Sequence, residues 1–109
     1  MKPGEVRWYT FKTPDKRRPV LILTRNSAIG FLNALTIAPL TSAIRDIPTE
    51  VYLSRSDGLL TECAVNLDNI QTVPKSKIGP LIATLSAELM EEVEQAISFA
   101  LGFDRPLYY

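Results

Sequence analysis

The first part of the chain alternates short apolar runs with polar turns, a pattern typical of β-strands. Aromatic and branched residues predict a first strand over Val6–Phe11, which ends in a polar turn that contains proline. The run Pro19–Thr24 is apolar on both faces, as expected of a strand that is covered on both sides. After a looser segment, a third strand is predicted over Ala34–Leu40. Its Pro39 should lie at an edge or a bulge, because proline cannot donate to the ladder.

Further short strands are predicted in the middle of the chain. Val51–Leu53 predicts a fourth strand, and the Asp57-Gly58 pair predicts a tight turn back into the next one. In that next strand, side chains alternate between the two faces. One set is expected in the core, namely Cys63, Val65 and Leu67, and the other is expected to point outward, namely Ala64, Asn66 and Asp68.

The last part of the chain predicts two more short strands, over Ile70–Val73 and Ile78–Leu85, and then a helix. Ser86 is a suitable N-cap, and apolar residues recur at helical spacing until Gly102. The glutamates of this helix are explained by a solvated face. Many short strands followed by one helix, in a chain of 109 residues without an internal repeat, predict one domain of the α+β class, a small β-barrel.

Composition narrows the chemistry that this chain can perform. The chain contains no histidine, which removes the commonest general base and the commonest metal ligand. A single cysteine, Cys63, cannot form an intramolecular disulfide, argues against a zinc site, and is expected to be a small apolar core residue. No apolar run approaches the roughly 20 residues of a membrane span, and no signal peptide is apparent. We therefore expect a cytoplasmic protein without a metal or cofactor.

The charges are unevenly distributed although their sum is zero. Residues 1–45 contain eight of the 12 Lys and Arg residues but only two of the 12 Asp and Glu residues. Such a split arises by chance in some small domains. It also fits a basic face that binds a polyanion, with the acidic helix turned elsewhere.

Five blocks of sequence, in order, resemble the MazF/PemK toxins. They are Gly4–Trp8, Arg17–Leu23, Ala38–Ser42, Val65–Lys75 and Ile78–Leu89. Each block is weak alone, but the ordered set is specific and covers nearly the whole chain, apart from a tail at residues 104–109. The resemblance implies an SH3-like barrel, of the kind shared by CcdB and PemK, that forms a homodimer with an RNA groove across it. It also implies a type II toxin, an mRNA interferase that is inhibited by a cognate antitoxin.

The resemblance implies a metal-independent endoribonuclease that cuts single-stranded RNA. In the family, the 2′-hydroxyl attacks the adjacent phosphate and leaves a 2′,3′-cyclic phosphate and a 5′-hydroxyl. The matching motifs carry the catalytic roles over to Arg18 and Thr41, with Ser42 beside Thr41. A guanidinium suits the charge of a phosphorane, and a hydroxyl at a strand end can position the scissile group.

The general base is left open by this sequence. Some relatives carry a Glu or His in the first loop, whereas the loop Lys12–Arg17 offers only Asp15. Asp68, where relatives offer an aspartate, is a second candidate. Where some relatives have an Arg two residues before that aspartate, this chain has Asn66. The residues expected to bind RNA are Lys12, Lys16, Arg17 and Asn66.

Two alternatives belong to other functional classes. A CcdB-like inhibitor of DNA gyrase would share the barrel, but it depends on a Trp-Gly-Ile ending that Phe99–Phe103 resembles poorly. An inactive homologue would bind RNA through the same basic face without cutting it. Aromatic residues near the N-terminus could stack on bases, as in many single-strand binders, or belong to the core.

Overall fold

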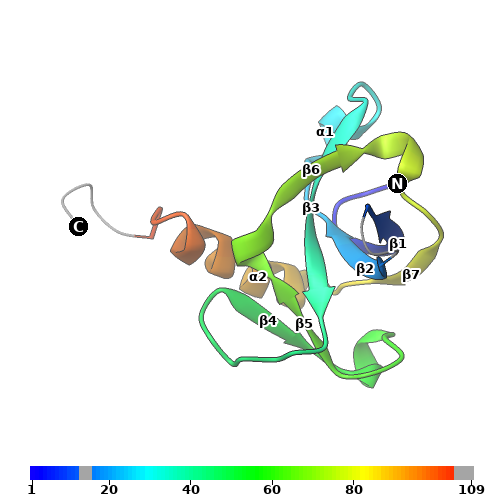
Figure 1. The fold of residues 1–109 in the computed structure, drawn as a ribbon. Coiled ribbons are helices and arrows are strands. Elements are labelled where there is room, and N and C mark those ends of the chain that lie inside the picture. The colour runs from blue at the N-terminus through cyan, green and yellow to red at the C-terminus, as the bar shows by residue number, and fades with distance from the viewer. Residues whose placement is uncertain (13–15, 105–109) are drawn as a thin grey trace.

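A computed structural model describes residues 1–12 and 16–104 (Figure 1). The strands are β1 (Glu5–Phe11), β2 (Lys16–Ile22), β3 (Ala34–Thr41), β4 (Glu50–Leu53), β5 (Cys63–Asn66), β6 (Gln71–Pro74) and β7 (Leu81–Thr84). The helices are α1 (Asn26–Ile29), the 3-10 turns η1 (Arg55–Asp57), η2 (Leu67–Asn69) and η3 (Lys75–Lys77), and the terminal α2 (Ala87–Ala100).

The strands form one antiparallel sheet in the order β4-β5-β3-β2-β1-β7, and β6 pairs with β3 beside this path. The sheet curls into a half-barrel, and α2 packs against β4 and η2 (Figure 1). This architecture confirms the predicted α+β class, a small barrel-like sheet with a C-terminal helix. In the part of the chain that the structure describes, no helix is long and apolar enough to span a membrane.

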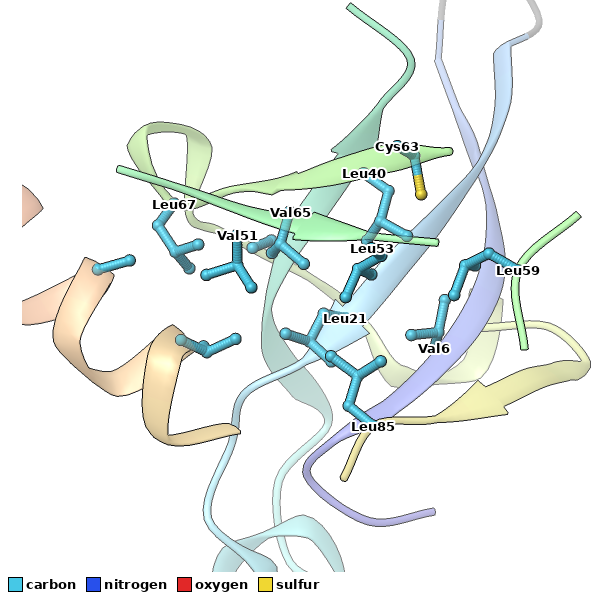
Figure 2. Close-up of a cluster of buried hydrophobic side chains, with 13 residues drawn as sticks. Val6, Leu21, Leu40, Val51, Leu53, Leu59, Cys63, Val65, Leu67 and Leu85 are labelled. Carbon is cyan, nitrogen blue, oxygen red and sulfur yellow. The ribbon is translucent and has the colours of Figure 1, made fainter. Parts of the chain in front are cut away.

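The main core fills the inside of the half-barrel (Figure 2). Its residues come from almost every strand, and α2 adds Val93 and Ala96. Val6, Leu21 and Leu53 are completely buried there. Because α2 presents an apolar stripe to this cluster, the helix seals the core that the curled sheet leaves open.

A second cluster covers the outer face of the central strands. Val20 and Ile22 belong to it, together with Ile29 of α1 and Val73 of β6, whereas Leu21 between them belongs to the main core. Both faces of β2 are therefore buried, which confirms the expectation for this apolar run. The strand begins at Lys16, three residues earlier than predicted, because the pairing with β1 extends to Phe11 and Lys16.

Strand β3 is the longest strand and changes partners along one edge. Residues 34–37 pair with β6, and Leu40 and Thr41 pair with β5, while β2 occupies the other edge. Pro39 is buried inside this paired strand, so the prediction of an edge position is wrong. A proline is tolerated because it lies in the gap between β6 and β5, where the ladder on that edge is interrupted.

Three other local expectations are corrected by the structure. The segment after β2 forms the short helix α1, and β5 ends at Asn66, so Asp68 lies on η2 and not on a strand. Ala64 is fully buried although outward exposure was expected. Ala64 pairs with Thr41 of β3 on one side and with Tyr52 of β4 on the other. Because its methyl group is small, these larger neighbouring side chains cover it.

Helix α2 follows the sequence prediction closely. The Ser86 hydroxyl accepts a hydrogen bond from the Leu89 amide at 3.2 Å, which confirms the predicted N-cap. Glu91, Glu92 and Glu94 are all exposed, as a solvated face requires. The helix ends at Ala100, and Gly102 takes a positive φ of 76° in the turn that follows.

Candidate active site

The pairing of β2 with β3 brings Arg18 and Thr41 together. Val20 lies opposite Pro39, and Leu21 lies opposite Ala38. The ladder ends at the Val20–Pro39 pair, and Arg18 and Thr41 each lie two residues beyond it, at the same end of the two strands.

Both residues line a cleft of about 550 Å³ at this end of the sheet, which we call the main cleft. Ser42 and Arg17 line it too, so four of the residues singled out from the sequence meet there. The complete lining is Trp8, Arg17, Arg18, Pro19, Leu40, Thr41, Ser42, Ala43, Leu59, Leu60, Thr61, Cys63 and Ile82.

Arg18 is half-buried and takes part in none of the ion pairs formed among the described residues, which join Arg7 to Glu5 and Arg45 to Glu50. Its side chain also borders a second hollow, of about 220 Å³, on the other side. That second hollow is lined by Phe11, Lys16, Arg18, Pro39, Asn69 and Gln71. Arg18 therefore borders both hollows and is not occupied by a carboxylate of the described residues.

Thr41 is held at the end of β3 by a local turn. Its Oγ1 accepts a hydrogen bond from the Ala43 amide at 3.1 Å. A hydroxyl has two lone pairs and one proton, so this bond occupies an acceptor position and leaves the proton to be donated. Ser42 beside it is exposed. The pair offers hydroxyl groups in the same cleft as Arg18.

Arg17 and Lys16 lie on β2 and not in a loop, which corrects the predicted loop of Lys12–Arg17. Alternation along the strand sends them to different places: Arg17 lines the main cleft and Lys16 lines the second hollow. Lys12 is exposed in the turn after β1. The three basic residues expected to bind RNA thus lie around the end of the β1–β2 hairpin.

Of the two candidate bases, the structure describes only Asp68, which lies outside both hollows. Asp68 is exposed on η2, where its Oδ2 accepts a hydrogen bond from the Thr49 hydroxyl at 2.6 Å. Asn66 caps the same turn, since its Oδ1 accepts from the Asp68 amide at 3.1 Å. Neither residue lines the main cleft or the second hollow. Asp15 lies outside the described residues.

The far wall of the cleft was missed by the sequence analysis. It consists of Leu59, Leu60 and Thr61, which follow the left-handed Gly58 at the end of η1. Leu60 remains 75% exposed, unusual for a leucine next to a turn. The adjacent pair of leucines after the Asp-Gly turn is the signal that could have indicated this wall.

The acidic helix begins at the opposite end of β1 and β2 from the main cleft. Its Met90 side chain lies against Gly4, and Leu23 shares a shallow groove with Met90 and Ile97. The glutamates of α2 are therefore separated from Arg17 and Arg18 by the length of the two strands. This arrangement matches the expected division between a basic end and an acidic helix.

Cys63 lies at the start of β5 on the floor of the main cleft, where its sulfur points into the core beside Leu40 (Figure 2). It is 8% exposed, which confirms its expected place as an apolar core residue. Burial raises the pKa of the Cys63 thiol above its ordinary value, with a smaller contribution from the charge of Asp57. A raised pKa keeps the group protonated, so it does not supply a thiolate nucleophile at neutral pH.

A half-barrel of this topology with a cationic cleft at the strand ends is the fold of the MazF toxins. Residues 2–101 match the family described as PemK-like, MazF-like toxin of type II toxin-antitoxin system. The endoribonuclease MazF3 of Mycobacterium tuberculosis is 39% identical over 90 residues, covering 83% of this chain and 87% of the relative. The probable endoribonuclease MazF2 of the same species is 32% identical over 103 residues, covering 94% and 99%.

Solved structures agree with this relationship. The Mycobacterium tuberculosis toxin MazF-mt6 superposes with a TM-score of 0.83 at 35% identity, covering 90% of this chain and 96% of that one. A mycobacterial endoribonuclease in complex with its cognate antitoxin gives a TM-score of 0.86 at 28% identity, covering 97% and 99%. The chain belongs to the PemK-like, MazF-like family of toxins of type II toxin–antitoxin systems, whose curated relatives here are endoribonucleases. Its class is that of an endoribonuclease toxin.

The position of Cys63 predicts a slow reaction with thiol reagents. With its pKa raised by burial, the thiolate fraction at pH 8 is smaller than that of an exposed cysteine, and access is restricted as well. Alkylation of the folded protein at pH 8 should be markedly slower than alkylation in urea, and it should accelerate as the pH rises. Equal rates for folded and unfolded chains would show that Cys63 is accessible and unperturbed.

Proposed function

We propose that this toxin cuts single-stranded RNA at a site formed by Arg18 and Thr41, without a metal ion. The 2′-hydroxyl attacks the adjacent phosphorus, the bond to the 5′-oxygen breaks, and the products end in a 2′,3′-cyclic phosphate and a 5′-hydroxyl. The observation that carries the proposal is that one cleft is lined both by Arg18, which lies outside the ion pairs of the described residues, and by Thr41, whose hydroxyl proton is available.

Arg18 acts on the charge that develops at phosphorus. The pentacovalent intermediate concentrates negative charge on its equatorial oxygens, and a guanidinium offers a permanent cation with forked donors that match them. The half-burial of Arg18 weakens the screening of its charge by water. Arg18 therefore stabilises the transition state more than the ground state, which is the requirement for catalysis.

Thr41 positions the reacting groups, and Ser42 extends the same hydroxyl surface. Because the Ala43 amide fixes Oγ1 from one side, the Thr41 proton can be donated to a phosphate oxygen or to the attacking hydroxyl. A residue on a paired strand holds that geometry better than a residue in a loop. None of the described residues that line the main cleft is a carboxylate. We therefore assign the main part of catalysis to charge stabilisation, with Asp15 remaining the candidate base.

Replacing either residue tests this assignment. Arg18→Ala and Thr41→Ala should each lower the rate of RNA cleavage by about a hundredfold or more, the effect of removing one preorganised donor. Arg25→Ala and Thr72→Ala, which change exposed residues outside both hollows, are matched controls and should cut at the normal rate. Circular dichroism and thermal melting establish that each variant is folded. Normal cleavage by a folded Arg18 or Thr41 variant would contradict the assignment.

Metal independence is a separate prediction. The chain has no histidine, and the described residues contain no group of three or more Cys, Asp or Glu side chains able to hold an ion. Cleavage followed on a fluorescent RNA should continue at an unchanged rate in excess EDTA. Loss of cleavage with EDTA and recovery with magnesium would replace the proposal by a carboxylate–metal mechanism. A wild-type protein that binds RNA but never cuts it would be the inactive homologue.

The same cleft is the proposed target of the antitoxin. One structural relative is an endoribonuclease in complex with its cognate antitoxin, and an acidic segment could cover a basic cleft by mimicking phosphates. We propose in addition that the chain acts in the cytoplasm as a homodimer. The toxin should sediment at twice the 12.2 kDa mass of one chain, and its complex with the co-expressed antitoxin should no longer bind RNA. A monomeric toxin would refute the homodimer. A complex that still binds RNA would refute the proposal that the antitoxin covers the main cleft.

A further inference from the structure

The main cleft contains an aromatic and cationic stack that the cleavage chemistry does not use. The guanidinium carbon of Arg17 lies 4.2 Å from the centroid of the Trp8 ring. Both side chains line the cleft that holds Arg18 and Thr41. Trp8 is half-buried, whereas Arg17 is exposed on the outside of the stack. The indole thus supports the guanidinium from below and leaves its outer side accessible.

The fold holds Trp8 firmly in this position. Its amide donates to the Pro80 carbonyl at 3.1 Å, and its carbonyl accepts from the Gly79 amide at 2.8 Å. A side chain at position 79 would bring its Cβ to 3.1 Å from the Trp8 carbonyl oxygen, so a glycine permits this close approach. On the other side, Trp8 lies opposite Pro19 in the β1–β2 ladder, and Arg17 lies opposite Thr10. Trp8 and Arg17 are therefore diagonal neighbours on one face of this ladder, which brings their side chains into contact.

Arg17 and Arg18 are consecutive residues of one strand, so their side chains leave the backbone on opposite faces. Arg18 borders both hollows, whereas the Arg17 guanidinium lies over the Trp8 ring within the main cleft. Both arginines nevertheless line the main cleft, so an RNA strand whose scissile phosphate lies at Arg18 can reach the Trp8–Arg17 stack within the same cleft.

We propose that the Trp8–Arg17 stack is a platform on which a nucleobase next to the scissile phosphate lies. This inference rests on the proposed function, since Arg18 defines where the phosphate binds. Bases of single-stranded nucleic acids stack on aromatic side chains and on guanidinium planes. A guanidinium is planar, delocalised and weakly hydrated, so it accepts a base on one face while an indole covers the other. The ligand is a base, and the site selects unstacked single strands over duplexes.

The platform gives Arg17 a role different from that of the nearby lysines. Lys12 lies in the turn and Lys16 borders the second hollow, and neither contacts Trp8 in the described structure. A lysine contributes a point charge to a phosphate backbone and carries no information about bases. Arg17 should therefore contribute to binding through the base as well as through its charge.

The platform can be observed directly, because Trp8 is the only tryptophan of the chain. Fluorescence of the wild-type protein is titrated with a 12-nucleotide single-stranded DNA of mixed sequence, which lacks the attacking 2′-hydroxyl and is not cut. A fully abasic strand of the same length has the same backbone charge and serves as the matched ligand. The base-bearing strand should quench Trp8 and bind more tightly, whereas the abasic strand should bind without quenching it.

Arg17→Lys separates stacking from charge. This variant keeps the positive charge but loses the planar guanidinium group. It should therefore bind the base-bearing strand about tenfold more weakly, within the range measured for loss of one stacked base. Its affinity for the abasic strand should be unchanged. Arg25→Lys makes the same chemical change at an exposed position outside both hollows and should leave both affinities unchanged. On RNA, Arg17→Lys should raise KM with little effect on kcat, and Trp8→Phe, which keeps a ring, should retain most activity.

Two results would overturn the platform: equal quenching by the base-bearing and abasic strands, or an Arg17→Lys variant with wild-type affinity for both. Failure of the proposed function gives a different result. A wild-type protein that shows base-dependent quenching but cuts no RNA keeps the platform and loses the catalytic assignment. Cleavage of RNA without any base-dependent change in Trp8 fluorescence keeps the catalytic assignment and rejects the platform.

Discussion

The pairing of β2 with β3 is the interaction on which the rest of this structure depends. It places Leu21 in the core inside the half-barrel and Val20 and Ile22 in the cluster outside it. Because the side-chain period of a strand is two residues, a slip of one residue would exchange these faces and expose both clusters. Burial on both sides thus fixes the register, and the same pairing brings the ends of β2 and β3, with Arg18 and Thr41, to one cleft. Core packing and site geometry are therefore determined by one ladder.

The site lies where this doubly buried ladder reaches the surface. Strand β3 changes its partner from β6 to β5 around Pro39, and the sheet curls at this point, so the ends of β2 and β3 border a hollow on each side. Rigid strands hold Arg17, Arg18 and Thr41, while the leucine-containing segment after Gly58 supplies the opposite wall. A wall built on paired strands is held more rigidly than a wall built on a loop, so the loop can vary in sequence without disturbing the strand residues.

Electrostatics follow from the direction of the strands. Four of the eight basic residues in residues 1–45 lie at the β1–β2 hairpin end, namely Lys12, Lys16, Arg17 and Arg18. Helix α2, with its exposed glutamates, begins beside Gly4 and Leu23 at the other end. A protein with no net charge can therefore present a local cationic surface to a polyanion. The same separation explains why overall composition is a poor guide to the partner of a small domain.

The sequence by itself determined the elements and the family. Apolar alternation predicted the strands and the burial of β2, Ser86 and the helical spacing predicted α2, and ordered blocks around Arg18 and Thr41 indicated the MazF-like family, because these signals are local in the chain. Only the tertiary structure decided what depends on contacts between distant segments. It buried Ala64 between two neighbouring strands, joined Asp68 to Thr49, separated Lys16 from Arg17, and laid Arg17 on Trp8. Register and curvature arise from packing of the whole sheet, and no single stretch of sequence contains them.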